Sequence, residues 1–168
     1  MDDKEGQFLQ MIKEHKGILF KICKIYQDSP DDRDDLLQEI IVQLWLVFDS
    51  FRRESKISSW MYRVALNTAI TFFKKQKRRP DSEILHPNFD VEEEASPGGE
   101  KERELAVFYK AVQQLSKVEK ALIYLYMENQ PYSEIAANLG ITEGNVRVRL
   151  NRVKNKLKEI IKTMNYEY

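Results

Sequence analysis

Apolar residues recur every three or four positions along most of this chain, the spacing that places them on one face of a helix. No segment carries a convincing strand pattern, and no internal repeat is evident. The pattern therefore predicts an all-α protein. The predicted helices cover residues 8–25, 31–48, 58–79, 105–115, 117–127, 132–139 and 143–164.

Residues that start or stop helices stand at the ends of these segments. Ser116 and Glu119 have the Ser-x-x-Glu spacing of a capping box, in which each side chain bonds to the backbone N–H of the other residue. Gly140 suits the left-handed backbone that often ends a helix. The remaining predicted boundary signals are Ser29 with Pro30, Ser58 or Ser59, and Thr142.

One stretch, residues 146–150, has an ambiguous pattern. Its sequence VRVRL alternates apolar and basic residues, which is typical of a half-buried strand. In a wider window, however, the apolar positions 146, 150, 153, 157 and 160 follow one another in steps of four and three. A helix places them all on one side and turns Val148 roughly 200° away from Val146. We therefore predict a helix with Val148 exposed.

The segment 81–104 differs in charge from the chain on either side of it. It carries 9 acidic and 2 basic residues, with few apolar ones, so it cannot bury a core of its own. Residues 1–80 carry 15 basic and 12 acidic residues, and residues 105–168 carry 10 and 6. We expect a flexible acidic linker between two small helical domains, with an acidic strip that imitates nucleic acid as the alternative.

Several classes of protein are disfavoured by what the chain lacks. No run approaches the roughly 18 apolar residues of a membrane span, and the first residues do not resemble a secretory signal, so we expect a cytoplasmic protein. Phosphate-binding loops, dinucleotide-binding glycines and metal-ligand motifs are missing, so we expect no enzyme activity, metal or cofactor. Cys23 is the single cysteine and lies in an apolar run, which favours a small buried side chain over a redox sensor.

The C-terminal helices have the order of a helix-turn-helix, in which the second helix enters the DNA major groove. A short helix, a glycine turn and a longer helix follow one another from Tyr132. Asparagine and arginine pair with adenine and guanine edges, and an exposed valine can meet a thymine methyl group. The alternative is a surface helix of a bundle. The candidate base-reading residues are Asn145, Arg147, Val148, Asn151 and Arg152.

Three segments of the chain resemble those of a known protein family. YSEIAANLGITEGNVRVRLNRVKNKL (132–157) is similar to region four of bacterial sigma factors, especially the extracytoplasmic-function (ECF) group. DDLLQEIIVQLW (34–45) resembles the helix of region two that docks on RNA polymerase, and SSWMYRVALNTAITFFKKQKRR (58–79) resembles the next helix, which meets the −10 promoter element. The order and spacing of these segments fit the family over nearly the whole chain.

The resemblance implies a region 2 domain at 1–80, a linker at 81–104 and a region 4 domain at 105–168. Polymerase docking is then expected at Asp34, Asp35, Gln38, Glu39, Gln43 and Trp45. The alternative for this helix is that Trp45 belongs to the domain core and the acids only cap the helix. Recognition of the −10 element is expected at Phe51, Ser55, Lys56, Arg63 and Asn67, with Asn67 as the foremost base contact.

Basic side chains near these surfaces are candidates for phosphate contacts, which add affinity without sequence information. On the C-terminal helix, the alternative is that the lysine stems cover the edge of the core. The candidates are Lys74, Lys75, Lys77, Arg78, Arg79, Arg149, Lys154, Lys156 and Lys158.

The expected partners are core RNA polymerase through its β′ and β subunits, promoter DNA, and an anti-sigma factor, the last implied by the resemblance alone. The expected function is promoter-directed transcription initiation, in which the protein melts the −10 region and reads the −35 element. The residues by themselves leave two other functions open, a polymerase-independent repressor or activator and a helical adaptor for an acidic protein.

Overall fold

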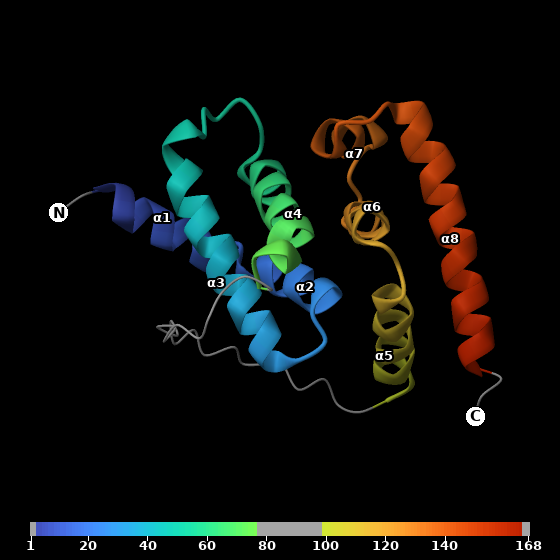
Figure 1. Cartoon of the computed structure of the whole chain (residues 1–168). Helices are drawn as coiled ribbons and strands as arrows, with labels where there is room; N and C mark the ends of the chain where they lie inside the picture. Colours follow the sequence, from blue (N-terminus) through green and yellow to red (C-terminus); the bar gives the residue numbers. More distant parts are fainter. Residues whose placement is uncertain (1–2, 77–98, 166–168) are drawn as a thin grey trace. The chain divides into compact units, whose positions relative to one another are not determined.

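A computed structural model describes residues 3–76 and 99–165, and all the regular structure within these ranges is helical (Figure 1). By their internal contacts, the helices form two compact units, one built on the N-terminal helices and the other mainly on the C-terminal helices. The prediction of an all-α chain is confirmed. Within the described ranges, no helix is both long and apolar enough to pass through a membrane.

The N-terminal unit is built on three mutually packed helices, α2, α3 and α4. Their buried faces share large apolar side chains, among them Ile22, Ile40 and Leu66. Its elements are α1 (Asp3–Glu14), α2 (Lys16–Tyr26), α3 (Pro30–Val47), the 3₁₀ turn η1 (Phe48–Ser50) and α4 (Ile57–Gln76).

The single helix predicted over residues 8–25 is wrong, because the chain breaks at His15 into α1 and α2. His15 has φ −113° and ψ 18°, outside the helical region. Ile12 and Leu19 are seven residues apart and both buried, so their spacing alone fits one continuous helix. Gly17, a weak helix former, lies next to the break.

The starts of the next two helices differ in how well the sequence predicts them. Ser29 caps α3 as predicted, since its hydroxyl accepts a hydrogen bond of 3.1 Å from the Asp32 N–H and Pro30 opens the helix. Helix α4 instead begins at Ile57, and the Trp60 N–H bonds to the Lys56 carbonyl at 3.2 Å. The prediction that Ser58 or Ser59 caps this helix is therefore wrong.

The C-terminal unit packs α8 against both α5 and α6. Its core includes Val112, Leu125, Ile135 and Leu150. Its helices are α5 (Glu100–Gln113), α6 (Lys117–Met127), the first part of α7 (Tyr132–Leu139) and α8 (Glu143–Asn165). Helix α5 starts five residues before the predicted 105, so residues 100–104 of the expected linker are helical, while residues 81–98 lie outside the described ranges.

Both ends of α6 are closed by local hydrogen bonds. The predicted capping box is confirmed, with Ser116 N–H to Glu119 Oε2 at 2.8 Å and Glu119 N–H to Ser116 Oγ at 3.3 Å. At the other end Asn129 has φ 56°, and the Gln130 N–H reaches the Leu125 carbonyl at 3.1 Å. This 6→1 bond is typical of a Schellman motif, in which asparagine tolerates the left-handed backbone.

Candidate nucleic-acid interface

The turn between α7 and α8 has the geometry that the sequence predicts. Gly140 has φ 67°, and the Ile141 N–H bonds to the Ala136 carbonyl at 3.1 Å across it. Thr142 then caps α8, because its hydroxyl accepts the Asn145 N–H at 3.2 Å. Short helix, left-handed glycine and capped long helix together form a helix-turn-helix.

Helix α8 buries the predicted stripe and exposes Val148. Val146, Leu150 and Val153 are 0%, 1% and 2% exposed, and Leu157 is buried beside them. Val148 is 50% exposed on the other side. Residues 146–150 are therefore helical, and the strand alternative is excluded.

All five candidate base-reading residues, Asn145, Arg147, Val148, Asn151 and Arg152, are exposed on α8. Arg147 also contacts α7, since its guanidinium carbon lies 5.7 Å from the centroid of the Tyr132 ring. This distance is within the range of a cation–π interaction. The Arg147 side chain is therefore partly oriented before any DNA binds.

Two of the lysines on α8 lie against α6. Lys154 Nζ is 3.8 Å from the centroid of the Tyr126 ring, and Lys156 Nζ is 3.0 Å from Glu119 Oε2. The ammonium groups of Lys154 and Lys156 are therefore both engaged with α6. Arg149 and Lys158 are exposed.

In the N-terminal unit, the candidate docking residues all lie on α3 but differ in exposure. Asp34 and Trp45 are exposed, whereas Asp35, Gln38, Glu39 and Gln43 are half-buried. Gln43 Nε2 donates to Glu39 Oε1 at 3.2 Å.

Two apolar residues on α3 went unrecognised in the sequence. Val42 and Leu46 are 49% and 67% exposed. They are four residues apart, and Val42 lies roughly 200° around the helix from the buried Ile40. This position, opposite the core stripe, is the signal that could have identified them, and we name the pair the α3 apolar pair.

Trp45 belongs partly to the surface and partly to the packing of the unit. The residue is 37% exposed. The Phe8 ring meets it edge-on at 5.0 Å between centroids, and Lys4 Nζ lies 4.4 Å from its centroid. Helix α1 thus contacts this side chain through both Phe8 and Lys4.

Residues 49–56, from the second residue of η1 to the start of α4, form what we call the −10 loop, after the role that we propose for it below. Phe51 is half-buried and its ring lies 5.2 Å from that of Trp60 on α4, while Ser55 and Lys56 are exposed. Arg53 has φ 57°, a left-handed conformation that costs a non-glycine residue roughly 1–2 kcal/mol. Arg63 and Asn67 are exposed on α4, four residues apart.

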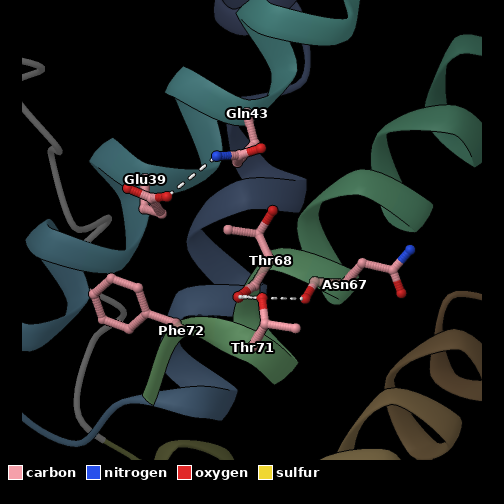
Figure 2. Close-up of a pocket in the computed structure, with 6 residues that line it drawn as sticks. All are labelled: Glu39, Gln43, Asn67, Thr68, Thr71 and Phe72. Carbon is pink, nitrogen blue, oxygen red and sulfur yellow. Dashed lines mark hydrogen bonds between the residues drawn. The ribbon is translucent and has the colours of Figure 1, made fainter. Parts of the chain in front are cut away.

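A pocket of about 200 Å³ lies between α3 and α4 (Figure 2). Two candidate docking residues and the candidate base contact Asn67 line it, a proximity that the sequence pattern did not predict. The Thr68 and Thr71 hydroxyls donate to backbone carbonyls of their own helix. In Figure 2 the Asn67 amide points away from α3. The lining residues are Glu39, Gln43, Asn67, Thr68, Thr71 and Phe72.

The basic run at the end of α4 is only partly described. Lys74 and Lys75 lie in the helix, but their side chains are outside the description, and Lys77, Arg78 and Arg79 lie outside the described ranges.

Cys23 is buried. Its burial, and to a smaller extent the nearby Asp34 charge, raises the pKa of the thiol to about 12. A thiol that stays protonated is a poor nucleophile, which agrees with a packing role. Within residues 3–76 and 99–165, no cluster of side chains suits a metal ion.

Comparison with known proteins identifies both units. Residues 11–79 match the family Sigma-70 region 2, and residues 105–157 match Sigma-70, region 4. The ECF RNA polymerase sigma-E factor of Escherichia coli K12 is 29% identical over 177 residues, covering 96% of this chain and 91% of that protein. The ECF RNA polymerase sigma factor SigM of Mycobacterium tuberculosis H37Rv is 25% identical over 159 residues, covering 94% and 79%.

Two solved structures share the fold. The sigma factor RpoE in complex with the anti-sigma factor NepR, from Bartonella quintana, has a TM-score of 0.69 at 23% identity and covers 96% of this chain and 98% of that one. CnrH in complex with the cytosolic domain of CnrY has a TM-score of 0.66 at 20% identity and covers 95% and 90%. With both family regions matched in order, the chain belongs to the sigma-70 family of RNA polymerase sigma factors, in its ECF group.

Proposed function

We propose that this sigma factor, which directs RNA polymerase to promoters, reads the −35 element with the exposed face of α8. The observation that carries the proposal is the division of α8 into a buried apolar stripe and an opposite face of amides and arginines around Val148. Amide and guanidinium groups make bidentate contacts to base edges in the major groove. Asn145, Arg147, Val148, Asn151 and Arg152 are the proposed base-reading residues, and Arg149 and Lys158 the proposed phosphate contacts.

The −10 element is read, in this proposal, by the −10 loop together with Arg63 and Asn67. Melting a promoter requires unstacked bases to be held, which costs a few kcal/mol that stacking and polar contacts offset. Phe51 offers a ring beside Trp60, and Ser55 and Lys56 offer exposed polar groups. Asn67, at the rim of the pocket between α3 and α4, supplies an amide for an unpaired base.

Core RNA polymerase binds the outer side of α3 in this proposal. The acidic and amide groups from Asp34 to Gln43 supply polar contacts, and part of Trp45 supplies an aromatic one. We add the α3 apolar pair, because exposed apolar side chains beside polar groups suit the centre of a protein interface. The domains would be 1–80 and 100–168, since α5 begins at Glu100, with residues 81–99 as the linker in place of the expected 81–104.

An anti-sigma factor is a further proposed partner, and the cytoplasm is the proposed location. NepR is named as an anti-sigma factor bound to RpoE in one of the two similar structures. A protein that covers the α3 apolar pair would block polymerase docking and shield exposed apolar surface at once. Such a partner should compete with core polymerase for binding to this sigma factor. A competition binding assay with the isolated partner measures this.

Run-off transcription with purified core polymerase tests the proposed function. Transcripts that appear when the protein is overexpressed identify candidate promoters, and these serve as templates. The expected result is initiation at defined positions that requires both promoter elements. A protein that binds the templates but gives no starts with the core enzyme would be a repressor or activator, and one that binds no DNA selectively would be an adaptor. Either result would reject the proposal.

A further inference from the structure

A series of aromatic contacts connects helix α1 with the −10 loop. The Phe8 ring on α1 meets the Phe48 ring in η1 at 5.3 Å between centroids and 75° between planes. Phe48 lies 6.4 Å from Trp60 on α4, and Trp60 lies 5.2 Å from Phe51 within the loop. These separations lie in the range of favourable ring pairs, about 4.5–7 Å.

A polar contact joins α1 to the same place. Lys4 Nζ lies 2.7 Å from Asp49 Oδ2, the first residue of the loop, and 4.4 Å from the centroid of the Trp45 ring. Phe8 also contacts Trp45. The first two turns of α1 therefore hold residues 45, 48 and 49, which form the junction between α3 and the loop.

The tip of the loop has little packing of its own. Residues 52–56 are all exposed, and Arg53 adopts a left-handed backbone. The direction in which the loop leaves α3 is therefore set at its ends, by Phe51 on Trp60 and by the junction that α1 holds. Groups that are held before binding lose less conformational entropy when the ligand arrives.

We propose that α1 is a positioning element for the −10 loop, with Lys4 and Phe8 as its positioning residues. The inference rests on the proposed reading of the −10 element by this loop. Neither residue needs to touch DNA. Their contacts keep Phe51, Ser55 and Lys56 in the arrangement that captures unstacked bases, so α1 governs promoter melting and discrimination between −10 sequences.

The experiment compares preassembled holoenzymes that carry Phe8→Leu or Lys4→Met. Leucine keeps an apolar side chain at position 8 but removes the ring, and methionine keeps the stem of Lys4 but removes the charge. Met11→Leu, a swap at another buried position of α1, is the matched control for Phe8→Leu, and Lys4→Arg is the conservative control for Lys4→Met. Three quantities are measured: the rate of duplex promoter opening, the affinity for a single-stranded −10 oligonucleotide, and the affinity for −35 duplex DNA.

We expect both variants to open the duplex promoter more slowly and to bind the −10 oligonucleotide more weakly. The expected loss is about twofold to tenfold for Phe8→Leu, the range implied by the strength of aromatic pairs, and at most about fivefold for Lys4→Met, because the Lys4–Asp49 ion pair is exposed. Discrimination between −10 base substitutions should shrink as well. Binding of −35 DNA should be unchanged, and Met11→Leu and Lys4→Arg should behave like the unaltered protein.

Two outcomes would overturn the inference, and they are distinguishable. If Phe51→Ala and Lys56→Ala impair opening but Phe8→Leu and Lys4→Met do not, or if Met11→Leu is equally impaired, α1 has no specific positioning role although the loop still reads the −10 element. If Phe51→Ala and Lys56→Ala also leave opening unchanged, the proposed −10 role of the loop itself is wrong.

Discussion

Lys156 Nζ lies 3.0 Å from Glu119 Oε2 and so joins α8, the proposed base-reading helix, to the first turn of α6. The same carboxylate accepts the Ser116 N–H at 2.8 Å and closes the capping box of α6. Glu119 therefore closes the capping box of α6 and also binds α8 to that helix. Lys154 adds a second contact between the same two helices through the Tyr126 ring.

The Glu119 contacts predict a pH dependence of stability. Burial disfavours the charged carboxylate, but the Ser116 backbone N–H and Lys156 outweigh it, so that the pKa of Glu119 is lowered from 4.5. Because the folded-state pKa is depressed, the stabilisation is fully present above the ordinary pKa and is lost as the pH falls through the folded-state value. We expect the melting temperature to fall below about pH 4.5, with a smaller fall in Glu119→Gln over that range. Parallel curves for the two proteins would contradict this role of Glu119.

The same contacts separate four basic residues of α8 into two groups by the salt dependence of DNA binding. Lys158→Met or Arg149→Ala should reduce the slope of log affinity against log salt by about 1, as expected for a lost phosphate contact. Lys154→Met and Lys156→Met should leave that slope nearly unchanged, because their ammonium groups are already engaged with α6. Titrations of −35 duplex DNA at several salt concentrations provide the measurement. Equal slopes for all four variants would reject this division.

If α8 reads bases, substitutions on its exposed face should weaken DNA binding by an amount that depends on the DNA sequence. Asn145→Ala or Arg147→Ala should cost about 1–3 kcal/mol on the preferred −35 site and relax specificity there. Competition binding against random duplex DNA measures the difference, with Arg149→Ala as the control for a sequence-independent loss. An equal loss on preferred and random DNA would reassign Asn145 and Arg147 as phosphate contacts.

The α3 apolar pair predicts a binding defect without a folding defect. Val42→Ser or Leu46→Ser should weaken core polymerase binding by about 1 kcal/mol each, from lost apolar burial, and should change unfolding free energy by less than about 0.5 kcal/mol. Leu9→Ser on α1, with an exposed fraction of 51%, is the matched control for a similar exposed side chain elsewhere. Affinity is measured by titration with labelled core enzyme. If Leu9→Ser weakens binding as much as the α3 variants, the effect is not specific to the docking face.

The left-handed backbone of Arg53 predicts a stabilising substitution. Glycine removes a strain of roughly 1–2 kcal/mol at this φ but adds about 0.5–1 kcal/mol of unfolded-state entropy, so Arg53→Gly should raise unfolding free energy by about 0.5 kcal/mol. Arg52→Gly has no such strain to relieve and should lower it by about 0.5–1 kcal/mol. Chemical denaturation of both variants decides the point, and destabilisation of both would show that Arg53 is not strained.

Local signals in the sequence were enough to predict most helix ends and the buried face of α8. Ser29, Ser116, Gly140 and Thr142 act on backbone groups within four residues, so their effect does not depend on the rest of the fold. The stripe from Val146 to Leu157 is likewise a property of helical periodicity.

Only the tertiary structure decided the break at His15, the division of Trp45 between surface and packing, and the engagement of Lys154 and Lys156 with α6. The last two depend on residues that are distant in the sequence. Trp45 meets Phe8 and Lys4 on another helix, and Lys156 reaches Glu119 across 37 positions. Helical periodicity states which face of a helix is apolar, but the partner of an exposed or half-buried side chain is set by how the helices pack.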